Sequence, residues 1–106
     1  MKTHPWLTTL FFCCALPVQA DGLSASRQQE LTHFVRQECG FCHGLRLTGG
    51  LGSSLTAAAL KDKSAEALIA TILYGRTGSA MPGWAPYLSE ADTQWIVAAL
   101  LKGFPE

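Results

Sequence analysis

The residues best suited to chemistry lie in one short stretch, where two cysteines three positions apart are followed directly by a histidine. They are Cys39, Cys42 and His43, in the run CGFCH. Such a trio has three uses in proteins: a redox-active dithiol, part of a zinc site, or the attachment point of a covalent haem. The rest of the chain has to discriminate among these uses.

The zinc interpretation lacks ligands. A structural zinc ion takes four ligands, usually cysteine or histidine side chains. Outside the N-terminal leader described below, the chain adds only His33 to the trio. Adjacent Cys42 and His43 are also poorly placed to bind one tetrahedral ion together. The sequence therefore disfavours a zinc site.

The dithiol interpretation is the stronger rival. A thioredoxin-like protein would use Cys39 and Cys42 as its redox pair, but that motif follows a buried β-strand in a βαβ unit. Here an amphipathic helix is expected before Cys39, and no alternating apolar pattern predicts a strand. A thioredoxin-like dithiol redox protein remains the alternative function.

The haem interpretation explains more of the sequence. C-x-x-C-H is the signature of c-type haem attachment, in which both thiols add to the haem vinyl groups. His43 is then held against the iron as an axial ligand by the same short turn. The expected second ligand is Met81, the only methionine outside the leader. Met81 lies in a loop bounded by glycine and proline, whereas a methionine that fills core gaps would favour a helix face.

This ligand set has a functional consequence. If protein side chains fill both axial positions, no open iron site remains for a substrate. We therefore expect a one-electron carrier with one haem c and no enzymatic activity. A methionine ligand would favour a raised reduction potential.

The first twenty residues have the pattern of a secretory signal peptide. Lys2 is followed by an apolar run and then by Val18 and Ala20, small residues at the spacing of a cleavage site. We expect residues 1–20 to be cleaved and residues 21–106 to form one domain in the periplasm. The apolar run is shorter than the roughly 20 residues that span a bilayer, so no stable membrane insertion is expected.

Composition limits the partners. Eight basic and eight acidic residues balance, and no basic stripe suggests a nucleic acid or an anionic membrane as ligand. A domain of this size has a marginal apolar core, and two cysteines three apart cannot supply a disulfide framework. A large cofactor would complete such a core. We expect a monomer that meets other redox proteins transiently.

The first helix must deliver the motif. Apolar residues at helical spacing predict a helix over residues 25–38, which brings Cys39 next to its apolar face. Its start is capped either by Ser24 or by Ser26, and in the second case Gln29 would complete a capping box.

The remaining elements also indicate an all-α domain. In chain order they are a glycine-rich loop over 44–54, a turn over 57–60 capped by Thr56, a helix between Ser64 and Gly75, an irregular loop over 75–88 with Met81, and a last helix over 90–102 that begins with Ser89 and Asp92.

The order of these features resembles a class I cytochrome c: an N-terminal helix, the attachment motif, a loop, a Met-Pro ligand loop and a C-terminal helix. The runs CGFCHG, LTGGLGSSLT and GRTGSAMPGW followed by LSEADTQWIV resemble a narrower group, NirC or cytochrome c55X, small periplasmic cytochromes associated with haem-d-containing nitrite reductases of denitrifiers. The resemblance implies His43 and Met81 as axial ligands. It also implies nitrite reductase, or the proteins of haem d biosynthesis, as redox partners.

The sequence departs from the class pattern in its details. A proline often supplies the carbonyl that accepts a hydrogen bond from the ligand histidine, and Ser53 occupies that place. A backbone carbonyl can still accept the bond. Val35 replaces an aromatic residue four positions before the first cysteine, and Ala99 replaces one in the last helix, with Trp95 a turn earlier. We expect the contact between the terminal helices to persist with different shapes.

Overall fold

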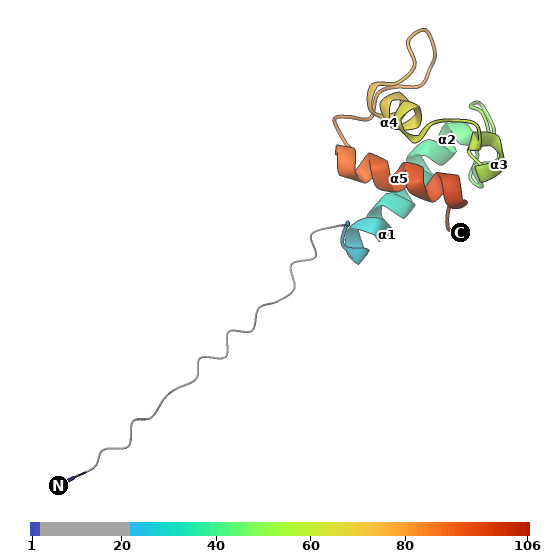
Figure 1. Ribbon diagram of the computed structural model, residues 1–106. Helices are drawn as coiled ribbons and strands as arrows, with labels where there is room; N and C mark the ends of the chain where they lie inside the picture. The colour runs from blue at the N-terminus through green and yellow to red at the C-terminus, as the bar shows by residue number, and fades with distance from the viewer. Residues whose placement is uncertain (3–21) are drawn as a thin grey trace.

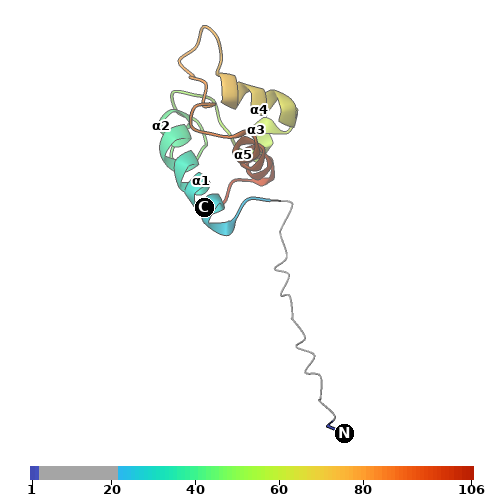
Figure 2. The ribbon, with the colours of Figure 1, turned by 90° about the vertical axis from the view of Figure 1, so that its left-hand side faces the viewer.

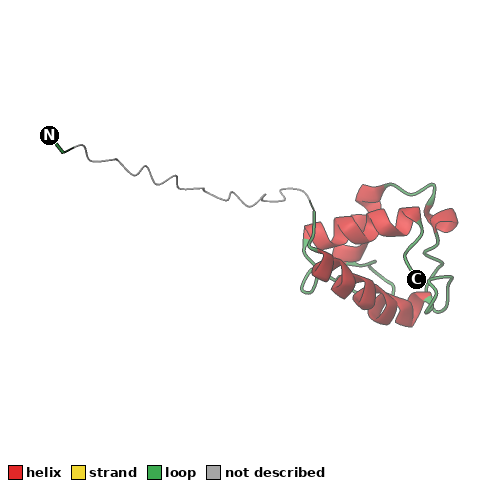
Figure 3. Ribbon diagram, turned by 90° about the horizontal axis from the view of Figure 1, so that it is seen from below, coloured by secondary structure: helices red, strands yellow, loops and turns green. Residues whose placement is uncertain are grey.

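The structure, a computed structural model, describes residues 1–2 and 22–106. Residues 22–106 fold into helices joined by loops, without a strand (Figures 1 and 3). The prediction of an all-α domain is therefore confirmed. The predicted signal peptide over 1–20 falls almost entirely outside the described residues. In the part of the chain that the structure describes, no helix is long and apolar enough to cross a membrane.

The N-terminal helix begins where the sequence indicated, and helical structure continues beyond the predicted end in two further segments. Helix α1, Ala25–Phe34, is capped by Ser24, whose Oγ accepts a hydrogen bond from the Arg27 N–H at 3.2 Å. The alternative cap, Ser26 with Gln29, is wrong because Ser26 lies inside the helix.

The predicted end at residue 38 is also wrong, because two further helical segments carry the chain through the motif. They are a π-helical segment, η1, Val35–Cys39, and a final turn, α2, Gly40–His43. The Gly40 N–H donates to the Val35 carbonyl, one residue further back than in an α-helix. The wider turn absorbs one residue without breaking the helix, a feature that often marks functional sites.

The later helices follow the predicted boundaries. Helix α3, Ala57–Leu60, is capped by Thr56, and helix α4, Ala65–Tyr74, is capped by Ser64. Helix α5, Glu90–Lys102, begins with a complete capping box in which Ser89 and Asp92 each bind the other's backbone N–H at 3.0 Å. Local capping signals therefore predicted these helix starts correctly.

The core forms where α5 packs against α1, α3 and α4 (Figures 1 and 2). Its buried apolar residues are Leu31, Val35, Leu47, Leu60, Leu73, Leu88, Ile96, Val97 and Leu100. Val35 is 0% exposed although it replaces the expected aromatic side chain. Trp95 stacks edge-to-face on Phe104 at 6.3 Å between ring centroids. Helices α1 and α5 are in contact, so the expected packing of the terminal helices persists with different side-chain shapes.

An ion pair joins the first turns of α1 and α5. The Arg27 guanidinium donates to both carboxylate oxygens of Asp92, at 3.0 and 2.7 Å, and to Glu30 at 2.7 Å. The side chain of Asp92 is only 7% exposed. Hydrogen bonds from Arg27, and secondly from Ser89, lower the pKa of Asp92 to about 2. The sequence pattern around Asp92 indicated a capping residue and gave no sign of this contact.

Candidate functional site

The structure brings three of the four predicted site residues onto one helical turn. Cys39 ends η1, and Cys42 and His43 lie on α2 directly after it. Both thiols are free and half-buried, and Cys39 packs against the apolar core. The turn therefore presents two free thiols and an imidazole from a helical segment that packs on the core.

The state of Cys39 bears on the dithiol alternative. Burial, and secondly the neighbouring Glu38 carboxylate, raise the pKa of the Cys39 thiol to about 11. A redox-active dithiol needs a thiolate, which proteins obtain by lowering a cysteine pKa. The helical turn before Cys39 also differs from the strand of a thioredoxin-like motif. Both observations disfavour the dithiol alternative.

The His43 ring is fixed by one hydrogen bond. Its Nδ1 lies 2.7 Å from the carbonyl oxygen of Ser53. A carbonyl oxygen can only accept, so in the neutral ring Nδ1 carries the proton and Nε2 keeps the lone pair that a metal requires. The expectation that the Ser53 carbonyl replaces that of a proline is therefore confirmed.

Gly52 allows the loop to pass close to this ring. A Cβ at position 52 would lie 2.8 Å from both Cε1 and Nδ1 of His43, closer than real contacts permit. The loop also binds the motif's backbone, because the Gly52 N–H donates to the Cys42 carbonyl at 2.7 Å and the Gly49 N–H to that of His43 at 2.8 Å. In the sequence these glycines indicated only a loop. Contact across the loop explains why position 52 has no side chain.

Met81 lies on a separate segment, in the loop between α4 and α5 that stands out from the helices in Figure 1. Met81 is half-buried, whereas residues 76–80 before it are exposed. Its role as the second axial ligand remains a prediction. Three residues later, Trp84 packs edge-to-face on Phe34 of α1, with 5.3 Å between ring centroids.

These residues fit a covalently bound haem. Two free thiols and an imidazole with an available Nε2 lone pair share one turn. Half-buried apolar side chains, including Phe34, Leu68, Ile72 and Trp84, surround the core and suit a large flat apolar group. The described residues contain no cluster of three or more His, Cys, Asp or Glu that could hold a metal ion by itself.

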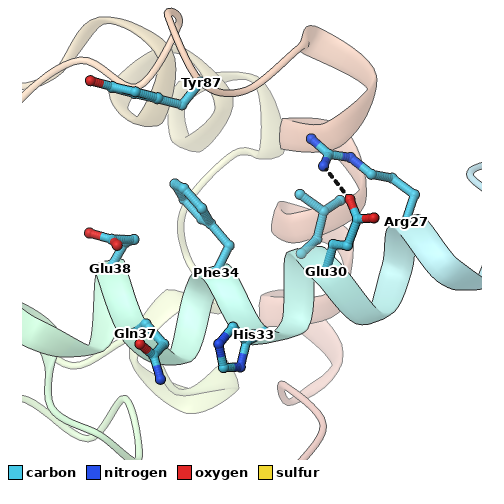
Figure 4. Close-up of a pocket in the computed structure, with 8 residues that line it drawn as sticks. Arg27, Glu30, His33, Phe34, Gln37, Glu38 and Tyr87 are labelled. Atoms are coloured by element: carbon cyan, nitrogen blue, oxygen red, sulfur yellow. Dashed lines mark hydrogen bonds and ion pairs between the residues drawn. The ribbon is translucent and has the colours of Figure 1, made fainter.

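A separate groove of about 350 Å³ runs along α1 (Figure 4). Its lining residues are Arg27, Glu30, Leu31, His33, Phe34, Gln37, Glu38 and Tyr87. None of the four predicted site residues lines it, and most of its side chains are polar or charged. Phe34 lines the groove and also belongs to the apolar side chains around the core, so the groove adjoins the predicted cofactor site without including its ligands.

Comparison with known proteins first defines the class. Residues 26–98 match the family described as cytochrome C oxidase, cbb3-type, subunit III. A solved structure described as c-type cytochrome NirC superposes with a TM-score of 0.74 at 51% identity, over 76% of this chain and 94% of that one. Together with the helical fold and the C-x-x-C-H turn, these matches define a class I c-type cytochrome, a class whose members carry covalently bound haem c.

The relatives then specify the family. Cytochrome c55X of Pseudomonas aeruginosa is 52% identical over 100 residues, which cover 92% of this chain and 84% of the relative. Cytochrome c55X of Paracoccus denitrificans is 59% identical over 78 residues, 74% of this chain and 76% of the relative. The chain belongs to the cytochrome c55X family.

A larger protein contains a similar domain. The structure described as dihydro-heme d1 dehydrogenase NirN in complex with DHE superposes with a TM-score of 0.64 at 32% identity. The match covers 70% of this chain and 16% of that one.

Proposed function

We propose that the protein binds one haem c through Cys39 and Cys42, with His43 and Met81 as axial ligands, and acts as a monomeric periplasmic one-electron carrier. When bound, the haem supplies the one-electron change between Fe(II) and Fe(III). The observation that carries the proposal is the 2.7 Å contact between His43 Nδ1 and the Ser53 carbonyl, on the turn that holds both free thiols.

The protein's own contribution is to fix the ligand geometry. The bond from Nδ1–H to the Ser53 carbonyl sets the tautomer and the orientation of the His43 ring. Met81 would supply the second ligand, so protein side chains would fill both ligand positions of the iron. This arrangement leaves no coordination position for a substrate and favours a carrier over an enzyme.

We further propose that the redox partners belong to the nitrite reductase system. Two roles fit: electron transfer with nitrite reductase itself, or with the proteins that complete its haem d. The likeness to NirN, a dehydrogenase of dihydro-haem d1 by its description, supports the second role. Mixing the reduced cytochrome with each purified partner and following its oxidation by absorbance discriminates between them.

The mass of the mature protein tests the cofactor. We expect residues 21–106 plus one haem, and no mass gain with a thiol-alkylating reagent because thioethers block both sulfurs. The haem should stay with the protein in acid-acetone extraction. Two alkylated thiols and no iron chromophore would support the dithiol alternative and overturn the haem assignment.

The ligand set has its own test. Met81→Ala should abolish the weak sulfur-to-iron absorption of the oxidised protein, lower its reduction potential and let carbon monoxide bind the reduced form. His33→Ala is the control, because His33 is exposed on α1 and should leave the spectrum unchanged. Persistence of the sulfur-to-iron absorption in Met81→Ala would exclude Met81 as the ligand.

A further inference from the structure

Two glycines close the base of the loop that carries Met81. A Cβ at Gly75 would lie 2.7 Å from the Met81 carbonyl oxygen and 2.8 Å from the Gly83 nitrogen. A Cβ at Gly83 would lie 2.7 Å from the Leu73 carbonyl oxygen and 3.0 Å from the carbonyl carbon of Tyr74. Each glycine therefore packs directly on the backbone of the opposite limb of the loop, where no side chain fits.

Hydrogen bonds connect the same two limbs. The Trp84 N–H donates to the Ile72 carbonyl at 2.9 Å, and the Ala85 N–H donates to the Leu73 carbonyl at 3.0 Å. Both acceptors lie in the last turn of α4, where carbonyls have no partner within the helix. The returning limb therefore completes the end of α4 and is fixed to a packed helix.

Met81 depends on this backbone support because its side chain has few hydrogen-bonding groups that could fix its position. A thioether is at most a weak hydrogen-bond acceptor, so no contact like that of His43 can orient it. The five residues before it are exposed. The Met81 carbonyl accepts from the Arg76 N–H at 3.3 Å, next to the contact with Gly75. The backbone at the base of the loop is what can determine where the sulfur lies.

We propose that Gly75 and Gly83 form a backbone clamp that positions Met81 as the sixth ligand, so that both glycines are positioning residues. This inference rests on the proposed ligation by Met81. Widening the contact by one methyl group would separate the limbs and move the sulfur from the iron. The protein would keep its covalent haem and its His43 ligand.

The loop provides a matched set of glycine-to-alanine variants. Gly83 does not have a positive φ, so Gly83→Ala tests only the steric overlap of the added Cβ, without backbone strain. Gly75→Ala adds a positive φ of 75° to the same lack of space. Gly78→Ala is the control: its φ is 79°, but an added Cβ meets nothing within 4 Å.

The variants are compared as purified holoproteins. We expect Gly83→Ala and Gly75→Ala to weaken the sulfur-to-iron absorption, lower the reduction potential and raise the affinity of the reduced form for carbon monoxide. The affinity should rise by about tenfold or more, the range expected for overpacking a closed contact. Gly78→Ala should match the unmodified protein in all three measurements.

Met81→Ala, measured in parallel, separates the two proposals. If Met81→Ala keeps the sulfur-to-iron absorption, the ligand assignment itself is wrong. If Met81→Ala loses it while Gly83→Ala and Gly78→Ala behave alike, the ligand is correct and the clamp is wrong.

Hydrogen exchange on the unmodified holoprotein keeps the test decisive if the alanine variants do not fold. The Trp84 and Ala85 amides should exchange as slowly as amides in the middle of α5, and the Gly78 amide should exchange rapidly. Rapid exchange at Trp84 and Ala85 would show that the loop base is open and would overturn the clamp.

Discussion

The segments that carry the two proposed axial ligands are held by different means. On the His43 side, the ligand's own ring is held, by the 2.7 Å bond to the Ser53 carbonyl and by contact with Gly52. On the Met81 side, the contacts are between backbones, at Gly75 and Gly83. The side chain of Met81 has no hydrogen bond of this kind available to it.

The difference indicates which ligand is easier to lose. Two proposed covalent bonds, the motif's helical turn and a hydrogen-bonded ring all support His43. Met81 depends on a loop whose preceding five residues are exposed and whose fixed part is its base. We therefore expect changes on the His43 side to affect haem retention and stability, and changes on the Met81 side to affect potential and ligand exchange.

The largest effect is expected from removing a covalent bond on the His43 side. Cys42→Ala leaves at most one thioether, so less haem should stay attached. Because the haem is the largest apolar group available to this small core, the yield of holoprotein should fall severely. The measurement is haem absorbance per unit of purified protein. Phe41→Ala is the matched control from the same turn, because Phe41 is 80% exposed and should not alter attachment. Equal yields would show that one cysteine suffices.

Gly52→Ala should have the next largest effect, because it acts directly on the His43 ring. The added Cβ would lie 2.8 Å from two ring atoms, and the ring cannot move away without stretching its bond to Ser53. We expect a loss of about 3 kcal/mol in the free energy of unfolding, the upper range for overpacking. Denaturant unfolding of the holoprotein measures it. An unchanged midpoint would show that the ring has room to shift.

The ion pair between Arg27 and Asp92 lies outside both ligand segments and serves as a reference for comparing them. Replacing Asp92 by asparagine removes the ion pair with Arg27 that joins α1 to α5. The pKa of Asp92 is lowered to about 2, mainly by Arg27, whereas an unfolded aspartate titrates near 3.9. The carboxylate therefore stabilises the fold by about 2 kcal/mol above roughly pH 4, and this contribution is lost as the pH falls toward 2.

The test follows unfolding of both proteins between pH 7 and pH 2. Asp92→Asn should be less stable at pH 7, and the difference should shrink below about pH 4. Its haem spectrum should not change, since neither ligand segment is involved. A constant difference across this range would mean that the Asp92 carboxylate does not titrate with folding.

Local sequence signals predicted most of the helix boundaries. Capping by Thr56, Ser64 and Ser89 depends on residues within one turn, and all three caps are present. The attachment motif is equally local. This explains why the all-α fold and the family could be inferred before the structure.

Contacts between distant residues could not be predicted in this way. The sequence shows no signal for pairing Arg27 with Asp92, which are 65 positions apart. Gly52 and Gly83 are indistinguishable from other loop glycines until the backbone or ring that each one faces is known. The π-helical turn of η1 could not be predicted either. The spacing of apolar residues along the first helix ends before Cys39, and it is not sensitive to a single wider turn.

The smallest effect is expected from Ser53→Ala, which tests whether the backbone alone holds His43. The bond uses the Ser53 carbonyl, which alanine retains, and Ser53 is exposed. Stability should therefore change by no more than about 0.5 kcal/mol, as for most surface substitutions. The reduction potential and spectrum should stay the same. Gly52→Ala alters the neighbouring position of the same loop and is expected to have a severe effect. Comparing the two variants therefore separates the effect of the loop's backbone geometry from that of the Ser53 side chain. A shifted reduction potential in Ser53→Ala would show that the Ser53 hydroxyl helps to orient His43. It would contradict the inference that the loop backbone alone holds this ligand.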